Sequence, residues 1–339
     1  MLETRSPIQV SPHFVERGTW LVWGLAVASV ALVLMGSLSG STGWHWPESA
    51  QDVLVWTIRA PRSVGAWCAG ALLGLAGAVA QGLFRNPLAD PFLLGSSSGA
   101  ALAVTLAWVV LGAAPAGAIP WLTSLGLTGA AFVGALAAVL LSVALARGVQ
   151  HSLRLLLGGV VVSVVLGALT SLIALWWPHV LAATQGFMLG NTALLSWRSV
   201  GVLASTWLIT LLIAMAASRV LDALTLGSDA ARSLGLPLAP ARWVLIAVIA
   251  ACTGAAVSQT GLVAFVGLAA PHAVRSLCRV THTRLVLLSS LMGGVLLIAA
   301  DLAARMVMAP LELPVGVLTA LLGGGYLLWR LQRTPVQAS

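Results

Sequence analysis

Four ionisable residues within otherwise apolar segments are the first candidates for chemistry in this sequence: Asp90, His272, Arg275 and Asp301. Ionisable groups inside a membrane are costly, and they commonly mark proton relays or ion pathways. Such groups are too sparse here for a proton relay or a sodium-coupled carrier to be the first choice, and an ion-coupled carrier is kept only as an alternative. The sequence therefore indicates that another source of energy drives its function.

A cluster of serines indicates a second kind of chemistry. The segment GSSSG, from Gly95 to Gly99, resembles the GxSx signature of rhomboid-type intramembrane proteases, which pair a serine with a histidine from another helix. His272 is the histidine that such a site would use. The serines also begin an apolar segment, however, and a helix N-terminus favours serine for capping alone. An intramembrane serine protease is therefore a remote alternative.

Motifs for binding nucleotides or metals are missing from the sequence. It contains no GxxxxGK[ST] phosphate-binding loop and no lysine. Its three cysteines lie in apolar stretches, without the spacing of a metal or redox site. We therefore expect no catalytic residue, no metal site and no covalently bound cofactor. If ATP supplies the energy, a separate ATPase subunit must bind the ATP and Mg²⁺.

The composition is that of an integral membrane protein. Hydrophobic residues make up 59% of the 339 residues and charged residues only 8%, and the mean hydropathy is +1.01. Apolar runs of about 20 residues recur along the chain, as is typical of membrane-spanning helices. The formal net charge of +8 comes from arginines scattered at the ends of these runs, so we expect no binding to nucleic acid.

Ten apolar segments are predicted to cross the membrane. Six lie within residues 19–218, at 20–38, 63–81, 91–111, 123–146, 155–177 and 200–218, and four lie within residues 243–331, at 243–259, 261–279, 285–305 and 315–329. The loop after the fifth span is expected to contain a short helix, and Pro271 is expected to interrupt the eighth span. Residues 1–339 thus form a single all-α transmembrane domain.

Residues 219–242 form a charged segment between the sixth and seventh spans. Gly227 is predicted to end one short helix and Ser228 to cap the next. Asp229 suits the first turn of that second helix, and Gly235 would end it. Two short helices outside the membrane, presenting charge together with leucine, would suit the binding of a soluble partner. A solvated connecting loop is the alternative interpretation.

The arginines predict the orientation of the chain. An even number of spans places both termini on the same side of the membrane. If that side is the cytoplasm, 13 arginines lie inside or at the inner ends of helices, namely residues 5, 17, 85, 147, 154, 219, 232, 242, 275, 279, 284, 330 and 333. The excess of inner arginines predicts cytoplasmic termini and a cytoplasmic segment 219–242. Four arginines remain outside: Arg59, Arg62, Arg198 and Arg305.

Several long motifs resemble those of one transporter family. They are RAPR at 59–62, GAVAQGLFRNPLADPFLLGSSSGA at 77–100, GLVAFVGLAAPHAVR at 261–275, DLAAR at 301–305 and ELPVGVLTALLGGGYLLWRL at 312–331. The chain resembles the FecCD/BtuC-like permease subunits of ABC importers for iron siderophores, haem and vitamin B12. The resemblance implies a BtuC-like type II importer fold and a homodimer with a central pathway in the bacterial inner membrane. It also implies two cytoplasmic ABC ATPases and one periplasmic binding protein as partners.

The resemblance assigns roles to individual residues as well. Docking of the binding protein is expected at Arg59, Arg62 and Arg305. Coupling to the ATPase is expected at Asp222, Leu226, Gly227, Ser228, Asp229, Arg232, Leu234 and Gly235. The pathway and its gate are expected at Asn86, Pro87, Ser96, Ser97, Ser98, Arg147, His151, Leu155, Gly158 and Gly159. Overall likeness to bacterial haem permeases makes haem the expected cargo, ahead of ferric siderophores and cobalamin.

Overall fold

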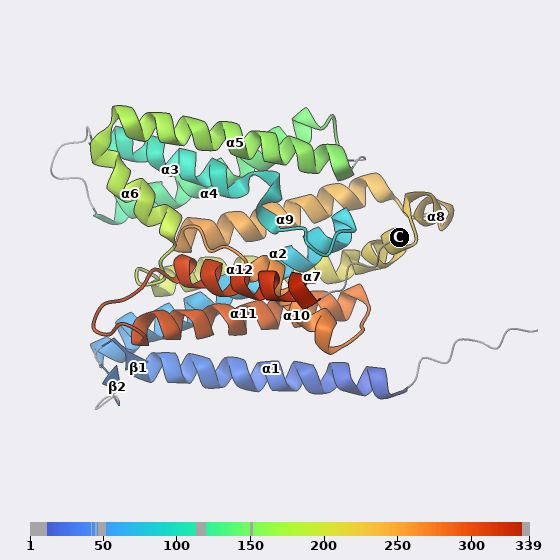
Figure 1. Ribbon diagram of the computed structural model, residues 1–339, viewed down its shortest axis with the longest axis horizontal. Coiled ribbons are helices and arrows are strands. Elements are labelled where there is room, and N and C mark those ends of the chain that lie inside the picture. Colours follow the sequence, from blue (N-terminus) through green and yellow to red (C-terminus); the bar gives the residue numbers. More distant parts are fainter. Residues whose placement is uncertain are drawn as a thin grey trace, which may run out of the picture.

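The computed structural model describes residues 12–41, 43–44, 46, 52–112, 120–149 and 152–333. Most helices run along a common direction in one bundle, and a two-stranded hairpin lies at one end (Figure 1). The elements are α1 (Pro12–Leu38), β1 (Ser39–Gly40), β2 (Gly43–Trp44), the π-helix η1 (Leu54–Arg59), α2 (Ala60–Phe84), the 3₁₀ helix η2 (Pro91–Leu94), α3 (Ser96–Gly112), α4 (Pro120–Leu145), α5 (Ser152–Trp176), α6 (Pro178–Leu189), α7 (Trp197–Thr225), α8 (Ser228–Ser233), α9 (Leu238–Thr260), α10 (Val266–Leu277), α11 (His282–Met306) and α12 (Val315–Arg333). The predicted all-α architecture is confirmed.

The bundle has two ends, named here by their landmarks. The strand end holds the β1–β2 hairpin and α6, and the elbow end holds α8 (Figure 1). Within the described residues, successive long helices run back and forth between these ends. Helix α1 begins and α12 ends at the elbow end. Both lie on the side of residues 219–242, as an even number of spans requires.

The eighth pass differs from the predicted span 261–279. Seven helices in the described part of the chain are long and apolar enough to cross a membrane, and α3 and α12 are shorter apolar helices. Helix α10 has only 12 residues, about 18 Å at 1.5 Å per residue, against a hydrocarbon core of about 30 Å. Non-helical residues 261–265 precede it. Pro271 lies inside α10, so the interruption falls before the helix rather than at the proline.

Helix α2 forms the buried centre of the bundle. Nearly all of its side chains are buried, and α10 and α11 approach it closely at glycines. A Cβ atom at Gly74 would lie 2.1 Å from the carbonyl oxygen of Ser289, and one at Gly77 would lie 1.7 Å from that of Gly267. Small residues let helix backbones meet in this way in membrane proteins. Because η1 runs directly into α2, the second pass begins at Leu54, earlier than predicted.

The segment 219–242 contains one separate short helix rather than two. Helix α7 continues to Thr225 and takes the place of the first predicted helix. Gly227, with φ of 106°, is the N-cap of α8, so the prediction that Ser228 caps this helix is wrong. Asp229 lies in the first turn of α8, as predicted. Gly235, at a φ of 73°, follows the end of the helix.

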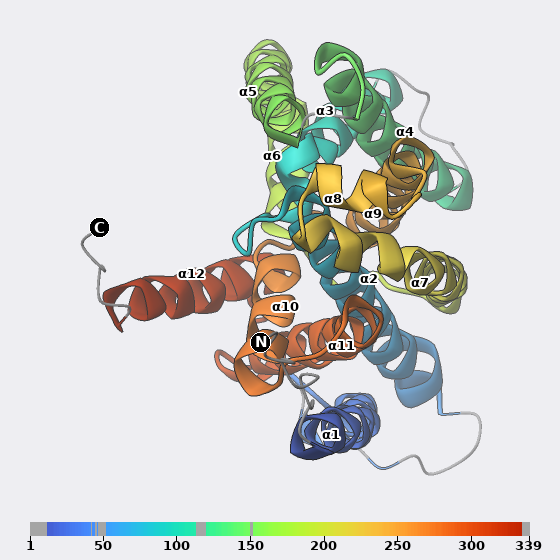
Figure 2. The ribbon, with the colours of Figure 1, turned by 90° about the vertical axis from the view of Figure 1, so that its right-hand side faces the viewer.

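Helices α1, α5 and α12 lie at the periphery of the bundle (Figure 2). Helix α12 projects from the other helices in this view and exposes Leu321 and Leu322. Helix α5 exposes apolar side chains such as Leu157 and Val161. Apolar faces of this kind are compatible with contact to lipid or to another membrane-embedded chain.

Candidate functional site

The three arginines predicted for docking gather at the strand end, but their side chains point inward. Arg59, Arg62 and Arg305 are only 5%, 7% and 1% exposed. Arg62 donates to Asp301 over 3.1 Å and to Glu312 over 2.7 Å, and Arg305 pairs with the other oxygen of Asp301. The expected outward-facing guanidinium groups are therefore not observed, because carboxylates of the same chain hold two of them.

Asp301 is the centre of this cluster. Its side chain is completely buried, and it also accepts a hydrogen bond of 2.5 Å from the Thr192 hydroxyl. Arg305 follows Asp301 by four residues, a spacing that places two side chains on one helix face. That pair is therefore readable from DLAAR, whereas Arg62 and Thr192 reach Asp301 only through the fold.

Arg59 has a different role at the same end. Its guanidinium group donates to the carbonyl of Leu38 over 2.9 Å and to that of Gly43 over 3.2 Å. A Cβ atom at Gly40 would lie 3.2 Å from Arg59 Cζ, so glycine in the hairpin leaves room for the guanidinium group. Arg59 thereby fastens the end of α1 and its hairpin to the start of α2.

The elbow end presents leucine and charge together, as predicted. Leu226 and Leu234 are 69% and 62% exposed. With Leu236 they help to line an open hollow of about 460 Å³. Asp229 and Arg232 form an exposed pair with an N–O distance of 3.4 Å, which contributes little to stability because solvent screens it. Exposed leucines beside charges are typical of a surface that binds another protein.

Arg242 joins the elbow to the predicted gate, and the sequence alone did not identify it as a site residue. It is only 4% exposed. Its Nη1 donates to the Val149 carbonyl over 3.4 Å, and its Nη2 donates to the Ser228 hydroxyl over 3.2 Å. Val149 lies between α4 and α5, and Ser228 begins α8. In the sequence this arginine resembles every other arginine at a span end, so only the fold distinguishes it.

Asp222 provides a second link from the elbow to the bundle. Its Oδ1 accepts hydrogen bonds from the backbone N–H of His282 over 3.0 Å and from the ring Nδ1 over 2.7 Å. His282 begins α11 and lies beside α2, since a Cβ atom at Gly82 would be 3.1 Å from its Nε2. This pairing connects the end of α7 with α11 and α2.

The segment from Asn86 to Ser98, named here the gate turn, joins α2 to the first turn of α3 and contains five of the predicted gate residues. Asn86 and Pro87 are exposed at the elbow end, and the Asn86 side chain accepts from the Leu88 N–H over 2.9 Å. Ser96 is completely buried, so its lining of an open path is not observed. Ser97 and Ser98 are partly buried in the first turn of α3.

The first turns of α5 pack against the protein's own gate turn. Leu155 is 1% exposed. A Cβ atom at Gly159 would lie 1.9 Å from the Leu93 carbonyl oxygen, and one at Gly158 would lie 3.1 Å from that of Ser142. These three predicted path residues therefore face their own chain. The two glycines let α5 approach η2 and α4 closely.

The exposed face of α5 is formed by other residues of this helix. Leu157, Val161 and Val164 are 58%, 55% and 66% exposed, and they are better placed to line a path than Leu155 or Gly159. Arg147, with φ of 54°, is exposed in the loop before α5. His151 lies outside the described residues.

Other candidates from the apolar segments stabilise α10 and the gate turn. The His272 ring lies edge-on to Tyr326, with centroids 5.7 Å apart, and Arg275 donates to the Gln81 side chain. Asp90 caps η2 by accepting from the Phe92 N–H over 2.8 Å. Burial raises the pKa of Asp90 to about 6. Within the described residues, no group of three or more His, Cys, Asp or Glu is arranged to hold a metal ion.

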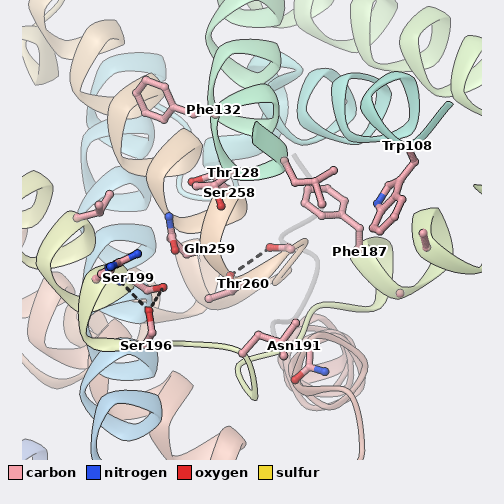
Figure 3. A pocket seen from close by; sticks show the side chains of 18 residues that line it. Trp108, Thr128, Phe132, Phe187, Asn191, Ser196, Ser199, Ser258, Gln259 and Thr260 are labelled. Atoms are coloured by element: carbon pink, nitrogen blue, oxygen red, sulfur yellow. Dashed lines mark hydrogen bonds between the residues drawn. The ribbon is translucent and has the colours of Figure 1, made fainter. Parts of the chain in front are cut away.

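A cavity of about 730 Å³ opens at the strand end, between α3, α4, α6, α7 and α9 (Figure 3). Ser196, Ser199 and Gln259 lie on one side of it, and Trp108 and Phe187 lie on the other. The sequence did not predict this cavity, because its lining residues come from five helices and from the segment between α6 and α7.

Comparison with known proteins agrees with this architecture. The FecCD transport family model matches residues 19–333. The chain is 36% identical over 320 residues to the hemin transport system permease protein HmuU of Yersinia pestis, covering 93% of this chain and 95% of that protein. It is 37% identical over 320 residues to the vitamin B12 import system permease protein BtuC of Pectobacterium atrosepticum, covering 91% and 92%.

A solved structure is similar over nearly the whole chain. It is a metal-chelate type ABC transporter in an inward-facing conformation, with a TM-score of 0.81 and 28% identity, covering 93% of this chain and 99% of that chain. The apolar helical bundle, the long family match and this structural likeness agree on one conclusion. The chain belongs to the FecCD transport family and is a multi-pass ABC importer permease of the inner membrane, in which ATP hydrolysis is carried by a separate subunit.

Proposed function

We propose that this permease imports haem, received from a periplasmic binding protein and passed to the cytoplasm along the axis of a homodimer. The observation that carries the choice of cargo is the apolar exposed face of α5. Ferric siderophores and cobalamin are the alternatives within the same transporter class. Similarity to HmuU supports haem, and the comparable similarity to BtuC supports cobalamin as the second candidate.

The exposed face of α5 suits a flat apolar macrocycle. Arg154 is the only charged residue of this helix. The hydroxyls of Ser163, Thr170 and Ser171 donate to carbonyls of their own helix over 2.8, 2.8 and 3.0 Å, so they are already engaged. A path with few free hydrogen-bonding groups favours a porphyrin over a corrinoid, because the amide side chains of a corrinoid would lose water without finding new partners.

The elbow end is proposed to face the cytoplasm, where two ATPase subunits would bind, one to each permease chain. The excess of arginine at this end supports the orientation. The exposed Leu226 and Leu234 beside Asp229 and Arg232 support an interface. Closure of the ATPases would move α8, and Arg242 would transmit that movement to the loop at Val149.

The strand end is proposed to dock one binding protein per homodimer through Arg59, Arg62 and Arg305. Since Arg62 already holds Glu312, whose side chain is 31% exposed, docking must proceed by exchange. A carboxylate of the binding protein would replace Glu312 on Arg62, while Asp301 stays in place as the buried counter-ion. Charged groups at such a rim set association rate and register more than raw affinity.

Uptake by the reconstituted transporter tests the proposed cargo. Proteoliposomes containing the permease and its ATPase would receive the binding protein loaded with haem, cyanocobalamin or a ferric siderophore. ATP-dependent accumulation of haem is expected, with the other two cargoes transported far more slowly. Accumulation of cobalamin or siderophore in place of haem would contradict the proposed cargo and leave the transporter class intact.

A further inference from the structure

The cavity at the strand end has a polar side and an apolar side. The polar side is formed by Ser196 and Ser199 at the start of α7 and by Gln259 near the end of α9 (Figure 3). The opposite side carries the rings of Trp108 and Phe187. Its volume of about 730 Å³ lies within the range of about 300–1,000 Å³ that is usual for small-molecule sites. The cavity therefore has the shape and polarity to hold an amphiphile.

The charge of the cavity is positive. Arg198 lines it and is exposed. None of the described residues that line the cavity is acidic. The first turn of α7, whose N-cap is Ser196, adds the partial positive charge of a helix N-terminus. A negatively charged group is therefore favoured beside Arg198.

Two glycines keep the cavity open. Gly129 of α4 and Gly186 of α6 both line it, and a Cβ atom added at either would meet no atom within 4 Å. Elsewhere in the molecule, glycines such as Gly77 allow backbones to touch. Gly129 and Gly186 have no such packing role, and their missing side chains leave space beside the aromatic rings.

We propose that this cavity binds one phospholipid with an anionic headgroup, taken from the outer leaflet of the surrounding membrane. The phosphate would lie at Arg198 and the start of α7. An acyl chain would extend over Phe187 and along the glycine side of α4 toward Phe132. The cavity lies at the end of membrane-spanning helices, where lipid headgroups and acyl chains meet, and Arg198 is complementary to an anionic headgroup. This proposal does not depend on the identity of the cargo.

Filling the cavity provides the first arm of the test. The permease–ATPase complex would be purified in detergent, mixed with phosphatidylglycerol or phosphatidylcholine, and examined by native mass spectrometry. Wild type is expected to retain one phosphatidylglycerol per permease chain, and Gly186→Leu is expected to lower that retention about tenfold or more. Gly201→Leu is the matched control, because Gly201 is equally unobstructed but does not line the cavity. It should retain lipid as wild type does.

Removing the charge provides the second arm. Arg198→Gln is expected to abolish the preference for phosphatidylglycerol over phosphatidylcholine, whereas Arg232→Gln at the elbow end should preserve it. Equal retention by Gly186→Leu and wild type would overturn the proposal. So would displacement of the lipid by millimolar inorganic phosphate, which would make this an ion site. Retention of haem instead of lipid, lost in Gly186→Leu, would assign the cavity to cargo and also overturn it.

Discussion

Two carboxylates at opposite ends of the molecule are held in different ways. Asp301, at the strand end, contacts Arg62, Arg305 and Thr192. Asp90, at the elbow end, caps η2 through the Phe92 N–H, and among the described residues no arginine or histidine forms an ion pair with it. Burial raises the pKa of Asp90 to about 6. The strand end is thus held by paired charges, whereas the gate turn holds a carboxylate whose pKa is raised by its surroundings.

This difference separates a fixed end from a movable one. Removing one partner of a buried ion pair leaves the other charge without compensation, so the strand end should resist rearrangement. At the elbow end, Arg242 and Asp222 make a few discrete hydrogen bonds between segments that otherwise expose leucine and charge. Such contacts can be exchanged at lower cost, as coupling to a moving partner requires.

The largest effect is expected from Asp301→Asn. This change leaves Arg62 and Arg305 without their shared buried counter-ion, and we expect a loss of about 3–5 kcal/mol in stability. Thermal unfolding of the purified permease measures it. Glu312→Gln is the matched control, because Glu312 is partly exposed and touches only the outer side of Arg62; its effect should be much smaller. An Asp301→Asn variant as stable as wild type would show that the strand end is not held by paired charge.

The second largest effect is expected from Arg242→Lys, on the coupling between ATP hydrolysis and transport. Lysine keeps the charge but lacks the fork that reaches both the Val149 carbonyl and the Ser228 hydroxyl. Haem uptake per ATP hydrolysed is expected to fall about tenfold, with ATPase activity of the complex within about twofold of wild type. Arg279→Lys is the control, because Arg279 is exposed between α10 and α11 and is not part of the proposed ATPase interface. Parallel loss of uptake and ATPase activity would indicate that Arg242 supports assembly rather than coupling.

A smaller effect is expected from Glu312→Gln on docking. If a carboxylate of the binding protein exchanges with Glu312 on Arg62, neutralising Glu312 removes a competitor. The dissociation constant of the binding protein should then decrease about three- to tenfold. Binding to the complex in nanodiscs at low and raised salt measures this, with Asp229→Asn at the elbow end as control. Weaker binding by Glu312→Gln would indicate that Glu312 itself contacts the binding protein.

The sequence predicts most spans and the position of the elbow, because both depend on local patterns, although the elbow has one separate short helix rather than two. Apolar runs and the Gly227–Gly235 segment were readable directly, and DLAAR carries the Asp301–Arg305 spacing. The burial and ion pairs of Arg62 could not be predicted, because its partners Asp301 and Glu312 are far from it in the sequence. Leu155 and Gly159 are buried because their side of α5 packs against η2. The sequence does not show which side of α5 is buried, because a helix that is apolar on all sides has no amphipathic pattern.

The smallest effect is expected in the pH dependence of stability, which should distinguish Asp90 from Asp301. Burial raises the pKa of Asp90 from its ordinary 3.8 to about 6, so the folded protein holds this proton more tightly than the unfolded chain does. The free energy of unfolding therefore decreases as pH rises from 3.8 to about 6, and it stays lower at higher pH. The stability of Asp90→Asn relative to wild type should therefore increase between about pH 4 and pH 7, and this difference should stay constant at higher pH. Asparagine can still accept from the Phe92 N–H, so the cap is kept.

Melting temperatures of both proteins across this range measure the difference, and the exposed Asp229→Asn should show no such trend. A constant difference between Asp90→Asn and wild type at every pH would mean that the pKa of Asp90 is the same in the folded and unfolded states. The contrast with Asp301 would then rest on pairing alone.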